Sequence, residues 1–329
     1  NLFIFLFSLP WSKLMKCLLV IFFLSVFMSV FGILKMLNES LMNSVPQYLC
    51  YPDTHMDHHE NIKPLCEPDK RYHAVIVIDS ACKNFAARQA VRATWGNQSY
   101  YASLGYKVRT FFTLGNPDWI DADLREKVLK ERDVYGDIVF INIVEHYKSI
   151  IHKVMYGLKS VQRFCSNTDM VVKADDDIFV DIVRLHTKFT GDSKLRSSLW
   201  CSAAKGTPSR DPANTWFVDP RVYNKTYPSY CLGSFYTLNI TSLSVLIRMA
   251  YCEPWFWIDD VFIAGDLRTR ANIPLRGLDS SEQYLSAGYN IYGERVDEIS
   301  AKKLKILYHH LITPEAMHHL WKLKIFRTK

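Results

Sequence analysis

Residues 169–180 read Asp-Met-Val-Val-Lys-Ala-Asp-Asp-Asp-Ile-Phe-Val. The apolar, partly β-branched residues 170–172 predict a short buried strand that ends at three consecutive aspartates. Neighbouring carboxylates repel one another, so a folded chain seldom places three of them at a strand end without a counter-charge. In open α/β sheets, ligands bind at the carboxyl ends of the strands. This stretch therefore favours a ligand site over the alternative, a solvated acidic turn.

The spacing of the aspartates suits a bound cation. Asp175 and Asp177 are two residues apart, so in an extended segment their side chains point the same way. One cation, or one cation and a ribose hydroxyl, could then be held between them. Because carboxylate oxygens suit Mn²⁺ or Mg²⁺, we expect one of these ions as the cofactor.

Composition places the chain among globular proteins. It has 329 residues, 49% hydrophobic and 14% aromatic, which is enough for one large domain with accessory segments. The net charge of +7 lies largely in residues 302–329, a basic face that could attract a diphosphate or an acidic membrane, or simply be solvated. No nucleic-acid-binding motif is present, so nucleic acid is not an expected partner.

The chain has eight cysteines, of which Cys17 lies in the apolar N-terminal segment. The other seven form no CxxC pair, so a zinc site is not expected. Scattered cysteines in a membrane-anchored chain fit lumenal disulfides. Because seven is odd, one of them is expected to be free or to bond another chain, and the connectivity stays open.

The N-terminal region predicts a membrane anchor. Residues 18–34 carry no charge, and with their apolar flanks they reach the about 20 residues that cross a bilayer. Two lysines precede this span and one follows it, which places the N-terminus in the cytosol. A cleaved signal peptide is the alternative, although its apolar region should be shorter. We predict a cytosolic tail at 1–13, a transmembrane signal-anchor at 14–37, a stem at 38–71 and a lumenal domain at 72–329.

From residue 73 onward, β-rich runs alternate with helical runs. Strands are predicted at 73–78, 108–114, 137–143 and 170–172, and helices at 84–95, 121–132 and 147–164. Repeated βα units predict an α/β fold with a mostly parallel central sheet and helices on both faces. No Walker loop or GxGxxG turn follows the first strand, so a nucleotide would have to be held by metal and side chains.

The second half is less regular. Residues 241–250 predict a helix with Thr241 as its N-cap. In residues 254–262, Asp259 and Asp260 follow three aromatic residues. Either aspartate could cap the next helix. Alternatively, one of them could have a raised pKa beside the aromatic rings and act as a general base.

Seven motifs in this order resemble those of glycosyltransferase family 31, which comprises β-1,3-galactosyltransferases and β-1,3-N-acetylglucosaminyltransferases. The match covers about residues 72–320. The motifs are RxxxRxTWG at 88–96, FxLG within 111–115, YxDIV at 135–139, KxDDDxFV at 173–180, YPxYCxG at 227–233, (E/D)DV within 258–261 and H-x3-P-x2-M at 310–317.

Two segments depart from the family pattern. Residues 142–153 keep only the Tyr, the Lys and one acidic position of the usual DFxDxYxNLTxK segment. Phe235 adds bulk to the GxGY motif at 233–236. The resemblance thus implies the reaction class and leaves the donor and acceptor sugars open.

The resemblance implies a GT-A-like fold in a single-pass type II Golgi membrane enzyme, with residues 72–329 as its lumenal catalytic domain. Such an enzyme would be an inverting β-1,3-hexosyltransferase. It would transfer galactose or N-acetylglucosamine from UDP-galactose or UDP-N-acetylglucosamine to a glycan acceptor on a glycoprotein or glycolipid.

By the same resemblance, Asp177 would bind the Mn²⁺ or Mg²⁺ ion, and His310 would complete its ligands. Asp175 and Asp176 would serve the ribose and the metal. Asp260 would be the catalytic base that accepts the proton of the acceptor hydroxyl.

Other residues keep two interpretations each. Arg88 and Arg92 are four apart, hence on one helix face, where they could contact the nucleotide or form structural ion pairs. Lys173 could face the diphosphate or offset the aspartates. Trp255 and Trp257 could stack on a sugar or pack in the core.

Two other functions remain open from the sequence. Carboxylate clusters also serve metal-dependent phosphoesterases, which would need further Asp or His ligands near strand ends. The same fold could also belong to a non-catalytic lumenal glycan-binding protein or chaperone.

Overall fold

The computed structural model describes residues 26–30, 32, 65–279, 281, 283–284 and 307–325. The chain divides into two compact units, Asn1–Pro52 and Asp53–Lys329. In the first unit, residues 26–30 and 32 are helical. Among the described residues, no helix has the length and apolarity needed to cross a bilayer. The predicted tail and most of the predicted signal-anchor and stem lie outside the described residues.

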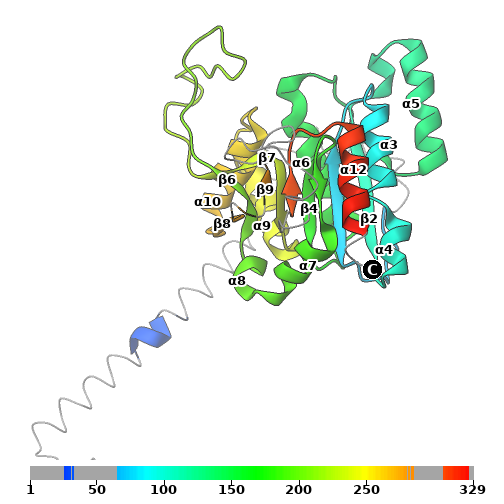
Figure 1. The fold of residues 1–329 in the computed structure, drawn as a ribbon. Coiled ribbons are helices and arrows are strands. Elements are labelled where there is room, and N and C mark those ends of the chain that lie inside the picture. Colours follow the sequence, from blue (N-terminus) through cyan, green and yellow to red (C-terminus); the bar gives the residue numbers. More distant parts are fainter. Residues whose placement is uncertain are drawn as a thin grey trace, which may run out of the picture. The chain divides into compact units, whose positions relative to one another are not determined.

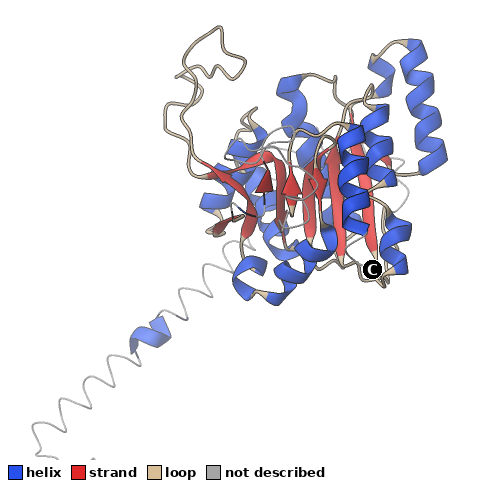
Figure 2. Cartoon of the chain, in the orientation of Figure 1, coloured by secondary structure: helices blue, strands red, loops and turns tan. Residues whose placement is uncertain are grey.

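In the second unit, seven of the described strands form one sheet, in the order β3-β2-β1-β4-β7-β6-β8. β1 (Ala74–Asp79), β2 (Val108–Leu114), β3 (Ile138–Phe140) and β4 (Val171–Asp175) run parallel. β7 (Tyr230–Leu238) is antiparallel to β4 and to β6 (Leu199–Ala204), and β8 (Leu275–Gly277) is parallel to β6. Helices pack around this sheet, as Figure 2 shows. The predicted α/β fold with a mostly parallel central sheet is confirmed.

A second, smaller sheet lies beside the aspartate stretch. β10 (Tyr308–His309) pairs with β5 (Phe179–Val180) on one side and with β9 (Gln283–Tyr284) on the other. The backbone N–H of Ile312 also donates to the carbonyl of Asp177 at 2.9 Å. The closing segment of the chain is thereby held next to the aspartates.

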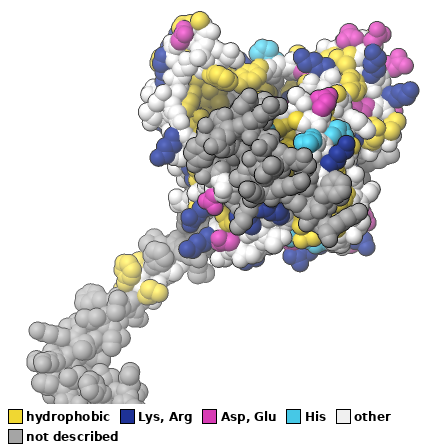
Figure 3. Space-filling model, in the orientation of Figure 1, with side chains coloured by type: hydrophobic (Ala, Val, Ile, Leu, Met, Phe, Trp, Pro, Cys, Tyr) yellow, Lys and Arg dark blue, Asp and Glu magenta, His cyan; other side chains and the backbone are white. Residues whose placement is uncertain are grey.

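The remaining elements connect and cover the strands (Figure 1). They are α3 (Phe85–Ala93), α4 (Gln98–Ser103), η2 (Pro117–Trp119), α5 (Ala122–Tyr135), η3 (Tyr147–Ser149), α6 (Ile150–Phe164), α7 (Ile182–Gly191), α8 (Ser193–Arg196), α9 (Ile240–Ala250), the π-helix η4 (Asp260–Leu267), α10 (Arg268–Arg270) and α12 (Pro314–Ile325). α6 packs on β1, β2 and α9, whereas α12 packs on α3. On the face drawn in Figure 3, acidic and basic side chains are interspersed rather than gathered by sign.

Local sequence explains these elements. Residues 74–78 of β1 are apolar and buried without interruption, as expected of a central parallel strand covered on both faces. α5 begins where the Asp121 side chain accepts a hydrogen bond from the backbone of Leu124. It ends at Gly136, whose φ of 62° is a left-handed conformation that glycine adopts at little cost.

Several predicted element boundaries differ from the observed ones. The strand predicted at 137–143 is shorter, at 138–140, and the helix predicted at 147–164 starts with the 3-10 turn η3. Thr241 is not the N-cap of α9, because the Asn239 side chain accepts from the Ser242 backbone at 2.6 Å. Asparagine is an equally strong capping residue, and it begins the helix two residues earlier.

Disulfides are present, as predicted. Cys66 is bonded to Cys165 at the end of α6, and Cys201 of β6 is bonded to Cys231 of β7. Cys252 is also disulfide-bonded. In the described part of the chain, Cys82 is the free thiol, and it is buried.

Candidate active site

The carboxyl ends of β1 and β4 meet at one edge of the sheet. Asp79 is the last residue of β1, and it lies opposite Asp175, the last residue of β4, in the parallel register. Adjacent parallel strands end at the same edge, which is where open α/β sheets bind ligands. The aspartate stretch thus lies where its sequence predicts.

Lys173 supplies the counter-charge at this edge. Its side chain is buried, and its Nζ lies 2.5 Å from Asp175 Oδ1 and donates to the carbonyl of Gly233. Burial disfavours the ammonium, but the carboxylates of Asp175, Asp259 and Asp79 outweigh burial and raise the pKa of Lys173. In this structure Lys173 therefore offsets the aspartates, which is one of its two predicted roles.

Asp259 and Asp260 lie at the start of η4. The structure contradicts side-chain capping by Asp259, which occupies the N-cap position without making a cap hydrogen bond. Asp260 Oδ1 accepts instead from the N–H of Val261, the next residue, at 2.7 Å. Gly233 of β7 allows a close approach, since a Cβ there would lie 3.3 Å from Asp260 Cβ. The two carboxyl groups are thereby packed directly against β7.

Burial is the largest influence on the pKa of Asp259 and of Asp260. It raises the pKa of both Asp259 and Asp260, and the lowering effect of Lys173 does not cancel it. The buried Asp259 Oδ2 has no hydrogen-bond partner among the described residues. We call Asp175, Asp259 and Asp260 the cavity carboxylates. Of these three, Asp259 and Asp260 hold protons more tightly than exposed aspartates do.

One cavity, of about 520 Å³, gathers four of the predicted site residues. Lys173, Asp175, Asp260 and His310 all line it. They come from β4, from the start of η4 and from the segment after β10, which are far apart in sequence. The cavity therefore has the polar groups and the size of a small-molecule site.

Asp177 has a buried carboxylate oxygen that a bound cation could contact. It does not line the cavity, but its Oδ1 is buried and has no hydrogen-bond partner among the described residues. Burial, followed by the charges of Asp175 and Asp176, raises its pKa to about 6. A buried carboxylate oxygen without a donor is a group that a cation would satisfy.

The surrounding donors fit an oxygen-preferring cation only in part. Burial lowers the pKa of His310 despite the nearby Asp175, which favours the neutral imidazole that a metal requires. Within the described residues, however, no three His, Cys, Asp or Glu side chains already converge as a metal cluster. The donor types around Asp177 thus suit Mn²⁺ or Mg²⁺, and their side chains would have to close around it.

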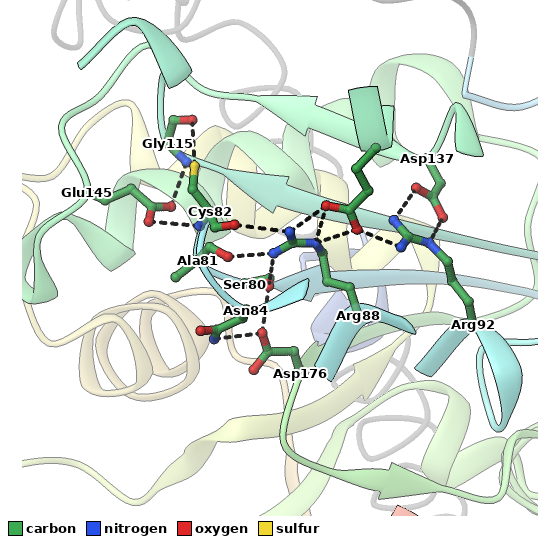
Figure 4. A network of polar contacts seen from close by, with 11 residues as sticks. Ser80, Ala81, Cys82, Asn84, Arg88, Arg92, Gly115, Asp137, Glu145 and Asp176 are labelled. Atoms are coloured by element: carbon green, nitrogen blue, oxygen red, sulfur yellow. Dashed lines mark hydrogen bonds and ion pairs between the residues drawn. The ribbon is translucent and has the colours of Figure 1, made fainter. Parts of the chain in front are cut away.

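Asp176 faces the loop after β1 rather than the cavity. Its Oδ2 accepts from Ser80 Oγ at 2.6 Å and from Asn84 Nδ2 at 3.0 Å (Figure 4). The carboxyl is buried, and it is absent from the cavity lining. Asp176 therefore fixes the loop at 80–84, a contact that differs from the expected ribose contact.

Arg88 and Arg92 are corrected to structural residues. Both arginines bind Glu131, and Arg92 also holds Asp137 with two hydrogen bonds of 2.8 Å. Arg88 is fully buried, and it further donates to Ser80 Oγ and to two backbone carbonyls (Figure 4). Every nitrogen of both guanidinium groups has a protein acceptor, so the ion-pair interpretation replaces nucleotide contact. We call Arg88, Arg92, Glu131 and Asp137 the arginine network.

The divergent segment 142–153 has an anchoring role. Glu145 accepts from the backbone N–H of Cys82 at 3.1 Å and of Gly115 at 2.8 Å, which joins the turns after β1 and β2 (Figure 4). Lys153 lies 3.1 Å from Asp79 Oδ1 and donates to the Ser80 carbonyl. The acidic and lysine positions that this segment keeps are therefore those that tie it to the strand ends.

Sequence reasoning missed several cavity residues. Asp79 lines the cavity, and burial raises its pKa to about 7; its place at the end of the first predicted strand was an available signal. Tyr147 and Trp216 also line the cavity. Tyr147 is the tyrosine that residues 142–153 keep from the family pattern, which was a signal, whereas nothing in the local sequence of Trp216 indicates its place. Of the two tryptophans left open, Trp257 lines the cavity, whereas Trp255 donates to the carbonyl of Ala250.

The domain thus combines an α/β fold with a carboxylate-rich cavity at the ends of its parallel strands. The profile of the galactosyltransferase family matches residues 86–279, more than half of the chain. The chain therefore belongs to the galactosyltransferase family.

Relatives agree with this assignment. β-1,3-Galactosyltransferase 1 of Mus musculus is 28% identical over 250 residues, covering 75% of this chain and 72% of the relative. β-1,3-Galactosyltransferase 5 of Pan paniscus is 27% identical over 327 residues, covering 95% and 98%. Among solved structures, the WbbM bifunctional glycosyltransferase aligns with a TM-score of 0.41 at 11% identity, over 79% of this chain and 52% of its own.

Proposed function

We propose that this protein is an inverting β-1,3-hexosyltransferase. It transfers galactose or N-acetylglucosamine from UDP-galactose or UDP-N-acetylglucosamine to a hydroxyl of a glycan acceptor. The observation that carries the proposal is that Asp260, a half-buried residue whose carboxyl has a raised pKa, shares one cavity with Lys173 and Asp175. Family membership and the names of the β-1,3-galactosyltransferase relatives support the bond type.

Asp260 acts as the general base. It accepts the proton of the acceptor hydroxyl as that oxygen attacks the anomeric carbon from the face opposite the UDP. The transition state is oxocarbenium-like, as in glycoside hydrolysis. A carboxylate with a raised pKa holds the transferred proton more firmly than an ordinary one. The hydrogen bond from the Val261 backbone and the packing against Gly233 keep this carboxyl oriented.

The donor binds at the β4 side of the cavity. Asp177, Asp175 and His310 would hold Mn²⁺ or Mg²⁺, and such an ion neutralises the departing diphosphate. The unpartnered Asp177 Oδ1 supports this assignment. Lys173 holds Asp175 in place, and a ribose contact of Asp175 remains a prediction. Asp176, in contrast, supports the site through Ser80 and Asn84.

We also propose a single-pass type II protein of the Golgi membrane whose catalytic domain is lumenal. The uncharged run at 18–34 supports the anchor. Disulfides such as Cys66–Cys165 and Cys201–Cys231 support an oxidising compartment.

The test is transfer by the purified protein from a panel of UDP-sugars to simple glycoside acceptors, with and without Mn²⁺. We expect a β-1,3-linked product with one of the two donors, identified by nuclear magnetic resonance. Release of phosphate without sugar transfer would instead indicate a phosphoesterase. The absence of any turnover together with binding of glycans would indicate a binding protein.

A further inference from the structure

The connection between β6 and β7, residues 205–229, has a fixed shape although it contains no helix or strand. It is the green loop that projects from the upper left of the domain in Figure 1. The Arg210 guanidinium donates to the carbonyls of Val218 and Tyr223 at 2.7 and 2.6 Å. The backbones of Ser209 and Phe217 pair in an isolated β-bridge. Long connections that are ordered by their own contacts are frequently functional.

Trp216 is the exposed aromatic residue of this loop. Its side chain is 55% exposed, but its orientation is set, because its indole Nε1 donates to the Tyr147 hydroxyl at 2.7 Å. Its backbone N–H donates to the Asn214 side chain at 2.8 Å. A large aromatic ring held in water is a surface that a partner can cover at little conformational cost.

Trp216 belongs to a group of rings that lines the cavity. Tyr147 lies between two tryptophans, since it accepts from Trp216 and its ring centroid is 6.2 Å from that of Trp257. The Lys148 ammonium lies over the Trp257 ring at 5.2 Å, so that ring is partly covered. All three rings line the same cavity as Asp260. We call Trp216, Tyr147 and Trp257 the aromatic wall.

The aromatic wall is close to the candidate base. Burial raises the pKa of Tyr147, and the charges of Asp259 and Asp260 raise it further, so these carboxylates act on the tyrosine hydroxyl. Lys173 acts on the same two aspartates. Asp260 is thus within electrostatic reach of both the aromatic wall and the Lys173–Asp175 pair.

We propose that the aromatic wall binds the acceptor sugar by stacking, with Trp216 as its main contact. This inference rests on the proposed function, because it divides the cavity of a transferase between two substrates. A pyranose presents C–H groups on one face, which pack on an aromatic ring, and hydroxyls at its edge, which reach polar groups. The Tyr147 hydroxyl and the side chains of Thr207 and Asn214 line the cavity and can meet those hydroxyls.

Charge separates the acceptor from the donor. A UDP-sugar carries a diphosphate, which needs cations, and the negative face of an aromatic ring does not attract it. The reacting group of the acceptor is a sugar hydroxyl, which needs no cation, and an aromatic surface suits the face of a pyranose. The wall therefore orients a hexopyranose whose hydroxyl reaches Asp260.

Steady-state kinetics of four variants test the proposal. Trp216→Ala should raise the KM for methyl β-galactoside or methyl N-acetyl-β-glucosaminide about tenfold, the value of one aromatic stacking contact, with little change in kcat. Trp216→Phe keeps an aromatic face, and Tyr147→Phe keeps its ring but loses the hydroxyl that accepts from Trp216, so both should have a smaller effect. Trp119→Ala is the matched control, because Trp119 is 49% exposed in η2 and does not line the cavity.

The variants separate stacking from two other roles of Trp216. If Trp216 only anchored its loop, Tyr147→Phe would be as harmful as Trp216→Ala, and the proposal would be overturned. If Trp216 stacked on uracil, Trp216→Ala would raise the dissociation constant of UDP and leave the acceptor KM unchanged, which would also overturn it. The phenylalanine variants keep the test decisive if Trp216→Ala does not fold.

A binding measurement distinguishes failure of this inference from failure of the proposed function. Titrating the same glycosides should quench the tryptophan fluorescence of the wild type and of Trp119→Ala, and should quench Trp216→Ala much less. A wild type that transfers sugar while Trp216→Ala keeps its acceptor KM contradicts only the aromatic wall. If the wild type transfers sugar from no UDP-sugar, the proposed function is contradicted. If the glycosides also fail to quench the fluorescence of the wild type, the aromatic wall is contradicted as well.

Discussion

The arginine network is largely buried and the cavity carboxylates are half-buried, and burial has opposite outcomes in the two groups. In the arginine network, burial alone would raise the pKa of Glu131, and the hydrogen bonds from the two arginines outweigh it and lower the pKa. In the cavity, burial prevails, and the pKa of Asp259 and of Asp260 is raised. Two guanidinium groups face two carboxylates in the network, whereas Lys173 is the ammonium that faces three carboxylates in the cavity. A charge-balanced cluster stabilises the fold, and an unbalanced one is left ready for a proton or a ligand.

The largest expected effect is on catalysis at the cavity. Asp260→Asn removes the proton acceptor and keeps the shape of the side chain, so kcat should fall by roughly 10²–10⁴-fold, the usual contribution of a general base. The dissociation constant of UDP, measured by calorimetry, should stay the same. Full turnover by this variant would show that another group is the base.

Substitutions in the arginine network should lower the stability of the fold rather than the rate of catalysis. Arg88→Met leaves Glu131 buried with one partner fewer, which costs about 3–5 kcal/mol of the free energy of unfolding. Urea denaturation followed by circular dichroism measures this loss. The double variant Arg88→Met/Glu131→Leu is the control, and it should recover most of the stability, because it leaves less buried charge unpaired. If the single variant lost less than 1 kcal/mol, the network would behave like an exposed ion pair.

A substitution in the cavity should increase stability, in contrast to the loss expected in the arginine network. Asp259→Asn removes a buried carboxylate whose Oδ2 has no partner among the described residues, and it lessens the repulsion within the pair. We expect a gain of about 0.5–1 kcal/mol in the free energy of unfolding together with reduced transfer, the usual trade-off at a functional site. A loss of stability in this variant would mean that Asp259 is already paired in the folded protein.

Another expected effect is on the pH dependence of stability. Burial raises the pKa of Asp79 from an ordinary 3.8 to about 7, so between these values the folded protein binds more protons than the unfolded chain. The contribution of Asp79 to stability is therefore present below pH 3.8 and is lost as the pH rises to about 7. Thermal midpoints of Asp79→Asn should vary less with pH across this range than those of the wild type. An identical pH profile would show that Lys153 and Lys173 keep Asp79 ionised throughout.

Local pattern was sufficient for much of the fold. The strand at 108–114 was predicted with its observed bounds, because a β-rich run is read within a few residues of chain. The helix boundary at Asn239 was missed because asparagine and threonine both cap helices, and only the observed hydrogen bond to Ser242 separates them. The 3-10 turn η3 was read as part of a longer helix, since both have similar side-chain periodicity.

The sequence predicted the site residues that lie at strand ends. It did not predict the contacts between residues that are far apart in the chain. Lys173 and Asp175 lie in or at the end of β4, so their place at the cavity follows from the sheet. Arg88 and its partner Glu131 are 43 residues apart, and Trp216 and Tyr147 are 69 apart. Sequence spacing carries no information about such pairs.

The sequence by itself determined the order of βα units, the strand end that carries the aspartate stretch and the family motifs, because each is written in consecutive residues. The tertiary structure decided which aspartates face the cavity. Asp176 turns to Ser80 while Asp260 turns to Gly233, because the neighbours that accept or exclude a carboxyl come from other strands. It also decided that Arg88 is structural, since a buried guanidinium must satisfy all its donors within the fold.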